Sequence, residues 1–196
     1  MTTWLGIDPG GRDTGVIALD RSRGQAPRLI SHETVTRTVD EDTVDQTRGV
    51  QVGPRYLAEV LDAVDRAIGT ATAVTGGAPR VAVETVVPPN PHVTRRDGNS
   101  LTNPKDAIAA AIVLGAVLTR WPDAVRVPPS RNGRALLATY PPELVTQAER
   151  RLGLSRPAQH KAKACHTRSA WDVALAGPGY ARAAHAAHLT RQEPLL

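Results

Sequence analysis

The 196-residue sequence has one cysteine, no phenylalanine and an aromatic content of 3%. The single cysteine, Cys165, cannot form an intramolecular disulfide, which agrees with a reducing compartment. No apolar run is long enough to span a bilayer, and the first expected strand follows Met1 too closely to leave room for a signal peptide. These absences argue against a disulfide-stapled secreted domain and against a membrane protein. We therefore expect a soluble, cytoplasmic protein whose core is built from Val, Leu, Ile and Ala.

The rest of the composition is that of a basic globular protein. Apolar residues make up 41% of the chain, and its length predicts one domain that can bury a core of its own. The formal net charge is +5 and the isoelectric point is near 10.0. A basic surface favours polyanionic partners such as nucleic acid, although many basic proteins bind none.

The first candidate site lies at the amino terminus. Residues 4–7 form a short apolar run typical of a buried strand, and Asp8 follows at its end. The Pro-Gly-Gly turn at 9–11 and a second apolar run at 15–19 predict a β-hairpin. An acid at the end of a core strand beside a glycine-rich turn can hold a divalent cation over a phosphate. Alternatively, Asp8 only caps the turn.

Further elements follow from hydrophobic periodicity, capping residues and turn residues. In chain order, we expect a strand at 28–35, a helix at 52–68, a linker at 70–79, a strand at 80–87, a loop at 88–103, a helix at 104–118, a strand at 124–127, a helix at 141–152, and helices at 166–176 and 179–188. Strands that alternate with helices after an opening meander predict a mixed sheet with helices on its faces.

Three acids stand isolated within apolar sequence, and this topology brings them together. Glu84 interrupts the strand at 80–87, where an unpaired carboxylate is costly to bury unless it faces water at a sheet edge. The sheet can place Asp8 beside Glu84, and Asp172 can reach the same place from a carboxy-terminal helix. Converging like charges repel one another, and a divalent cation removes that cost. Two cations about 4 Å apart can hold the attacking and leaving oxygens of a phosphodiester.

The ordered set of motifs resembles the RuvC family of Holliday-junction resolvases, within the ribonuclease H-like superfamily. The motifs are Gly6-Ile7-Asp8-Pro9-Gly10 with Thr14-Gly15, Val83-Glu84, Asn103-Pro104 before a helix containing Leu114-Gly115-Ala116, and Asp172-Val173-Ala174-Leu175-Ala176. They span roughly residues 3–177. The resemblance implies an α/β fold with a ribonuclease H-like mixed five-stranded sheet flanked by helices. We expect one nuclease domain over 1–196, with its core at about 3–177 and a carboxy-terminal helix at about 179–189.

The resemblance also implies an activity. It predicts a homodimer that resolves four-way DNA junctions by paired nicking, through attack of a metal-activated water on a phosphodiester. Asp8, Glu84 and Asp172 would be the metal ligands, with two Mg²⁺ ions in each active site and Mn²⁺ as a possible substitute. The helix at 104–118 is apolar nearly all round, so we expect part of it to meet the same helix of a second subunit.

One position departs from the family pattern. Members place Asp or His three residues before the last Asp, and this chain has Ser169 there. His166 is the nearest substitute as a metal ligand or general base. Six residues before Asp172, however, it does not share a helix face with that acid. The alternative is a histidine exposed to solvent at the start of the helix.

The candidate DNA-binding residues are basic. The family uses an aromatic residue in the loop after the Glu strand to stack on bases, and the segment 88–103 has none. The candidates for phosphate contacts are Arg95, Arg96, Lys105, Lys161, Lys163 and Arg168. The alternative is an ordinary solvated charge run. Two other functions stay open: an actin-like phosphate-binding ATPase or kinase fragment, and a non-catalytic scaffold that binds branched DNA.

Overall fold

The computed structural model describes residues 2–22, 24–38, 52–86, 104–130, 133–157 and 164–192. Its centre is a five-stranded sheet in the order β3-β2-β1-β4-β5. The strands are β1 (Thr3–Asp8), β2 (Asp13–Asp20), β3 (Arg28–Thr36), β4 (Arg80–Glu84) and β5 (Val125–Val127). The pairs β1–β2 and β2–β3 are antiparallel, whereas β1–β4 and β4–β5 are parallel. The mixed sheet expected from the sequence is confirmed.

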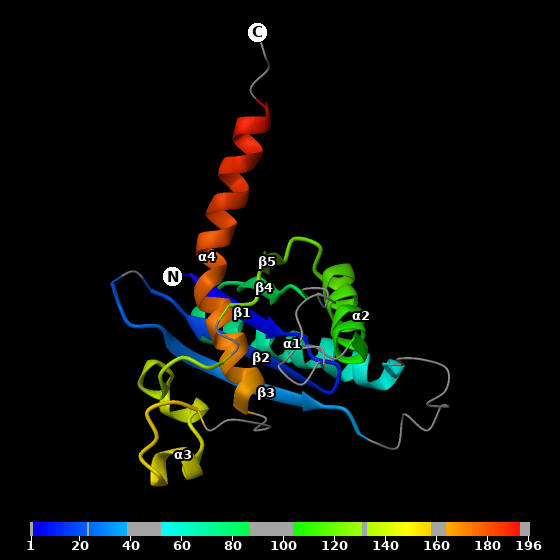
Figure 1. Ribbon diagram of the computed structural model, residues 1–196. Coiled ribbons are helices and arrows are strands. Elements are labelled where there is room, and N and C mark those ends of the chain that lie inside the picture. The colour runs from blue at the N-terminus through cyan, green and yellow to red at the C-terminus, as the bar shows by residue number, and fades with distance from the viewer. Residues whose placement is uncertain are drawn as a thin grey trace, which may run out of the picture.

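Helices cover both faces of this sheet (Figure 1). The helical elements are α1 (Pro54–Thr75), α2 (Pro104–Arg120), α3 (Gln147–Arg151), α4 (Ala164–Gln192) and the short 3-10 helices η2 (Leu137–Thr139) and η3 (Pro142–Leu144). On one face lie α1 and α2, and α4 crosses the other face before its carboxy-terminal end projects beyond the sheet. None of the helices in the described ranges combines the length and apolarity that a membrane crossing requires.

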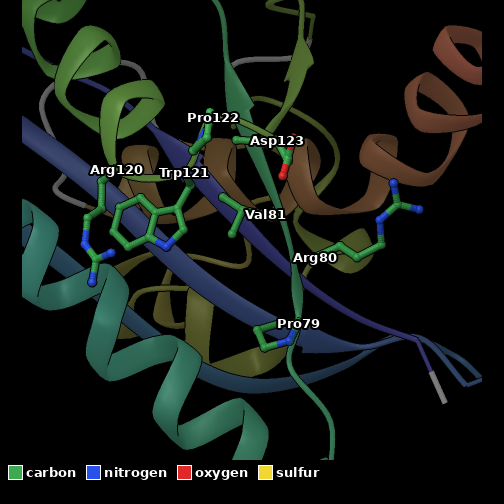
Figure 2. Close-up of a pocket in the computed structure, with 8 residues that line it drawn as sticks. Pro79, Arg80, Val81, Arg120, Trp121, Pro122 and Asp123 are labelled. Carbon is green, nitrogen blue, oxygen red and sulfur yellow. The ribbon is translucent and has the colours of Figure 1, made fainter. Parts of the chain in front are cut away.

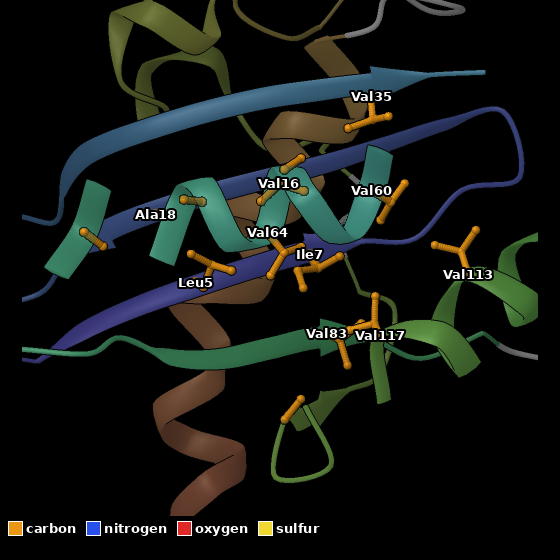
Figure 3. Close-up of a cluster of buried hydrophobic side chains, with 14 of the residues drawn as sticks. Leu5, Ile7, Val16, Ala18, Val35, Val60, Val64, Val83, Val113 and Val117 are labelled. Carbon is orange, nitrogen blue, oxygen red and sulfur yellow. The ribbon is translucent and has the colours of Figure 1, made fainter. Parts of the chain in front are cut away.

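The alternation of side chains along β1 decides which way Asp8 points. Leu5 and Ile7 pack into the cluster beneath α1 and α2 (Figure 3). Trp4 packs into the second cluster, on the side of α4. Successive strand residues face opposite sides of a sheet, so Asp8 falls on the same side as Trp4. The strand therefore delivers its terminal carboxylate to the face that α4 covers.

The same alternation governs β4. Val83 joins the first cluster and Ala82 joins the second, so Glu84 also faces α4. Glu84 is buried, and β4 lies between β1 and β5. The alternative of an edge position facing water is therefore excluded. Because β1 and β4 are parallel neighbours, their carboxyl ends lie side by side, and so do the acids that end them.

Two glycines allow α4 to lie directly on the strands. A Cβ atom at Gly6 of β1 would overlap the carbonyl oxygen of Ala170, and one at Gly15 of β2 would overlap that of His166. Both conflicts involve helix backbone, which cannot rotate away. The amino-terminal half of α4 is thereby held against the ends of β1 and β2.

Replacing Gly15 by alanine should therefore destabilise the protein. We expect a loss of about 3 kcal/mol or more in the free energy of unfolding, because the added methyl group has to push the helix off the sheet. Urea unfolding measures this change. Gly69→Ala is the control, since a Cβ there meets nothing within 4 Å and alanine favours the helix by up to about 1 kcal/mol. Equal stability of the Gly15→Ala and wild-type proteins would contradict the close packing.

Several element boundaries differ from the expected ones. The expected linker at 70–79 is helical as far as Thr75, because Ala67 and Ala71 extend the buried face of α1 in the core. The hydroxyls of Thr70, Thr72 and Thr75 donate to carbonyls four residues earlier and so do not disrupt the helix. The strand expected at 80–87 ends at Glu84. The two expected carboxy-terminal helices are one, since α4 continues through Pro178.

The helix expected at 141–152 is broken into η3 and α3. Thr146 starts α3 with a capping box, in which its hydroxyl accepts from the Glu149 amide and the Glu149 carboxylate accepts from the Thr146 amide. Because the backbone of Thr146 is extended, Thr146 begins α3 as its N-cap and cannot belong to a helix that continues from η3.

Candidate active site

Asp8 and His166 form the first contact of the candidate site. The Nδ1 atom of His166 lies 2.9 Å from Oδ2 of Asp8. Burial by itself would lower the pKa of His166, but the hydrogen bond and the charge of Asp8 raise it above its ordinary value. His166 does stand in the first turn of α4, as the alternative expected, but its side chain is only 34% exposed and is bonded rather than free in solvent. His166 lies within α4, and its partner is one of the predicted metal ligands.

The turn after Asp8 is fixed from below by α1. The Tyr56 hydroxyl donates to the carbonyl of Gly10 at 3.0 Å and lies 2.8 Å from the Thr14 hydroxyl. Burial raises the pKa of Tyr56 to about 12, so the phenol keeps its proton as a donor. These bonds hold the loop between β1 and β2 and thereby the position of Asp8.

Glu84 is buried and lies near both other acids of the site. The Ser169 hydroxyl donates to its Oε2 atom at 2.9 Å. Burial and then the charge of Asp8 raise the pKa of Glu84 to about 8, against the opposing effect of the Ser169 hydrogen bond. Asp172 adds a smaller effect in the same upward direction. Asp8 is thus close enough to disfavour the charge on Glu84.

Asp172 is held by a residue that sequence reasoning missed. Tyr140, directly after η2, donates its hydroxyl proton to Oδ2 of Asp172 at 2.9 Å and accepts from the Ala135 amide at 3.1 Å. Burial and the charge of Asp172 raise the pKa of Tyr140, so it remains a donor. No local pattern in the proline-containing segment around Tyr140 indicates this contact, which depends on how the segment folds back onto α4.

Three residues of α4, each three positions apart, serve this site in a row. His166 meets Asp8, Ser169 meets Glu84, and Asp172 meets Tyr140. Each step of three advances about 4.5 Å along the helix and shifts about 60° around it, so the row winds around α4 and its two ends stand about 120° apart. His166 and Asp172, which the sequence places on different faces, therefore act on different partners within one site.

Arg168 is not placed as expected from the sequence. It was expected to face DNA, but its side chain is only 1% exposed and its Nη1 atom bonds both carboxylate oxygens of Glu149, at 2.9 and 3.1 Å. Its guanidinium also lies over the Tyr140 ring, 5.9 Å from the centroid. Burial would raise the pKa of Glu149, but hydrogen bonds from Thr146 and then from Arg168 lower it overall. Arg168 is a buried structural cation that ties α3 to α4.

The other expected DNA-binding residues are placed only in part. Arg95, Arg96, Lys161 and Lys163 lie outside the described residues. Lys105 is exposed near the start of α2. A basic residue that the sequence analysis did not single out, Arg134, is exposed, and its charge acts on Cys165, the neighbour of His166.

The donor set suits a hard divalent cation. Such ions prefer carboxylate oxygens, and a cation beside Asp8 and Glu84 would relieve the repulsion that raises the pKa of Glu84. Within the described ranges, no three or more His, Cys, Asp or Glu side chains form a ready-made metal cage. Asp172 accepts its hydrogen bond from Tyr140. The residues fit a cation held mainly by the two strand acids.

Comparison with protein-family models and with curated proteins gives no match to this sequence. Among solved structures, the chain is similar to "T. thermophilus RuvC in complex with Holliday junction substrate", with 19% identity, 94% of this chain and 97% of that chain covered, and a TM-score of 0.51. It is also similar to the "Thermus thermophilus RuvC structure", with 20% identity, 93% and 97% covered, and a TM-score of 0.50. At this identity the likeness shows the fold, and the expected fold class is confirmed: the chain has the ribonuclease H-like fold of RuvC.

Proposed function

We propose that this protein is a metal-dependent endonuclease that cleaves branched DNA, with the four-way junction as its substrate. The observation that carries the proposal is the pairing of Asp8 and Glu84 at the carboxyl ends of two central parallel strands, beneath His166 and Ser169 of α4. Two further facts support it. The formal net charge of +5 favours a polyanion, and a RuvC protein of the same fold has been solved with a Holliday junction.

The residues of the site take distinct roles in this proposal. Asp8 and Glu84 would hold Mg²⁺ or Mn²⁺, with Asp172 as the third carboxylate. When bound, the metal supplies an activated water and charge stabilisation for phosphodiester hydrolysis. Ser169 orients the Glu84 carboxyl through its hydrogen bond. With Nδ1 of His166 engaged by Asp8, Nε2 is the atom through which the ring exchanges a proton.

Ser169 in place of a fourth acid has a consequence for metal loading. Mg²⁺ requires near-octahedral oxygen coordination, and three carboxylates leave a second ion held mainly by water and the scissile phosphate. We therefore expect the DNA-free protein to bind one cation detectably. The second ion should bind together with the substrate.

The test uses purified protein with labelled four-way, forked and linear duplexes, in Mg²⁺ and in chelator. We expect paired nicks near the junction in Mg²⁺, with no cleavage in chelator and an intact linear duplex. Tight junction binding without cleavage in Mg²⁺ or Mn²⁺ would favour the non-catalytic scaffold. Hydrolysis of ATP without cleavage of any DNA would favour the phosphate-binding ATPase or kinase.

Symmetric resolution requires two active sites, and we propose that α2 supplies the dimer contact. This helix was expected to be apolar nearly all round and to meet its copy in a second subunit, and in the single chain Ile108 is 52% and Ile112 37% exposed. One helical turn further on, Gly115 has open space where a Cβ would stand. An apolar strip with a small residue allows close approach of the same strip from a second copy.

Ile112→Glu should therefore give a monomer at micromolar concentration, because two glutamates would face each other across the two-fold axis. Sedimentation measures the mass, and single nicks should replace paired incisions in the junction assay. Val74→Glu is the matched control, since Val74 is 53% exposed on α1 and should leave the dimer intact. A monomeric wild-type protein, with and without DNA, would contradict the arrangement.

A further inference from the structure

A basic depression lies at the end of the sheet opposite to the candidate active site. It has a volume of about 680 Å³ and lies between the amino-terminal end of β1 and the outer half of α4. Its lining consists of Thr2, Trp4, Arg21, Ser22, Gly24, Gln25, Arg80, Pro178 and Arg182. We call Arg21, Arg80 and Arg182 the arginine triad.

The fold brings the triad together from three elements. Trp4 and Arg80 are register partners on neighbouring strands, and the Arg80 guanidinium lies over the Trp4 ring, 4.9 Å from its centroid. Arg21, just after β2, donates from Nη1 to the carbonyl of Leu175 at 2.9 Å. Arg182 lies one turn beyond Pro178 in the carboxy-terminal half of α4.

The charge of the triad is not neutralised within its own lining, which contains no acid. The nearest acid in sequence to Arg21 is Asp20, which accepts from Ser22 at 2.9 Å and faces Arg28 at 3.9 Å. In the described part of the chain, neither Arg80 nor Arg182 forms an ion pair. Three guanidinium groups without carboxylates form a site for an anion.

Arg120 provides the contrast, because it also lies over a tryptophan ring. Its guanidinium is 5.4 Å from the Trp121 centroid, but Asp65 neutralises it at 3.6 Å. Figure 2 shows both arginines in one view, where Arg80 extends away from Trp121. Stacking on tryptophan is therefore common to the two positions. Within the described residues Arg120 forms an ion pair, whereas Arg80 forms none, although Asp123 lines the same depression.

We propose that the arginine triad binds backbone phosphates of a DNA arm that runs along the outer half of α4, away from the cleaved bond. The planar guanidinium fork matches the phosphate group and binds it with two parallel hydrogen bonds. His185, which lines an adjoining depression with Arg80 and Arg182, continues the polar surface along the helix. The inference rests on the proposed function for the identity of its ligand.

The geometry sets the distance of these contacts from the active site. Arg80 and Glu84 stand at opposite ends of β4, about 13 Å apart at ~3.3 Å per residue. Along α4, Arg182 lies about 24 Å from His166 at ~1.5 Å per residue. With a rise of about 3.4 Å per nucleotide along the duplex axis, the contacts fall roughly four to seven nucleotides from the cleaved bond.

The test compares Arg80→Ala/Arg182→Ala with wild type, and Arg120→Ala as the matched control. Junction affinity of the double variant should fall about tenfold or more, and the slope of log affinity against log salt should flatten by about 0.9 for each phosphate that the variant no longer binds. Ethylation of phosphates four to seven nucleotides from the nick should weaken binding of the wild type and not of the double variant.

An unchanged salt slope in the double variant would overturn the inference, and so would an equal loss of affinity in Arg120→Ala. Inorganic phosphate that protects the triad from arginine-modifying reagents, with no change in DNA binding, would also overturn it in favour of a small-anion site. Failure of the proposed function gives a different pattern. In that case no DNA is cleaved, while the change in salt slope still reports on the triad.

Discussion

Replacing Glu84 by glutamine is expected to reduce DNA cleavage by roughly a thousandfold or more, because the substitution removes one of the two carboxylates proposed to hold the cation. The junction assay in Mg²⁺ measures this loss. Titration calorimetry with Mn²⁺ in the absence of DNA should show one site in the wild type and none in Glu84→Gln. Junction binding in chelator should be largely unchanged, since the substitution leaves in place the basic side chains that are proposed to contact DNA.

The same substitution should stabilise the metal-free protein. Glu84 is buried beside Asp8, and their repulsion, together with burial, raises its pKa to about 8. Glutamine has nearly the same shape, carries no charge and can still accept the hydrogen bond from Ser169. A gain of about 1 kcal/mol corresponds to a rise of about 2–4 °C in Tm for a chain of this length. The carboxylate that the site needs to bind a metal would then lower the stability of the metal-free protein.

Asp172→Asn is the matched control for this pair of effects. Asp172 is partly exposed and accepts its hydrogen bond from Tyr140, so removing its charge relieves little strain. We expect Asp172→Asn to lose cleavage without the gain in Tm. Full cleavage by Glu84→Gln would remove that residue from the proposed machinery. An unchanged or lower Tm in chelator would contradict the repulsion between Glu84 and Asp8.

The strand acids were predictable because their signals are local. Asp8 ends an apolar run and precedes a glycine turn, and Glu84 interrupts an apolar strand. The alternation along each strand then places both on one face. Asp172 likewise stands within an apolar stretch, and the mixed sheet expected from the order of elements, with a helix packed across it, can bring the three acids to one region.

The partners of these acids were not predictable in the same way. Tyr140 reaches Asp172, and Arg168 reaches Glu149, across segments that have no common periodicity. Arg168 did carry one signal, since it stands beside the apolar stretch around Trp171, where a buried charge requires a partner. The continuous path of α4 through Pro178 depends on packing against the sheet, which outweighs the local preference of proline.

The second large effect is expected at the buried ion pair of α3 and α4. Glu149→Gln would leave the Arg168 guanidinium buried without a counter-charge. Removing one partner from a buried pair costs about 3–5 kcal/mol, so we expect a loss of that size in the free energy of unfolding. Because the pKa of Glu149 is lowered in the fold, the pair stabilises the wild type above pH ~4.5 and loses this effect as the pH falls further. The difference in free energy of unfolding between the wild type and Glu149→Gln should therefore decrease as the pH is lowered.

Glu143→Gln is the matched control for this substitution, since Glu143 is an exposed acid of η3 in the same segment and should change stability by less than about 0.5 kcal/mol.

Tyr140→Phe tests whether this segment also positions the active site, as distinct from stabilising the fold. It keeps the ring beneath Arg168 and removes only the hydroxyl that donates to Asp172. Loss of a group that orients a metal ligand typically costs about 10–100-fold, so cleavage should fall by that factor. Because the hydroxyl also accepts from the Ala135 amide, stability should fall by about 1–2 kcal/mol, which is less than the loss expected for Glu149→Gln. Wild-type stability of Glu149→Gln would contradict the buried pair, and full cleavage by Tyr140→Phe would reduce Tyr140 to a packing residue.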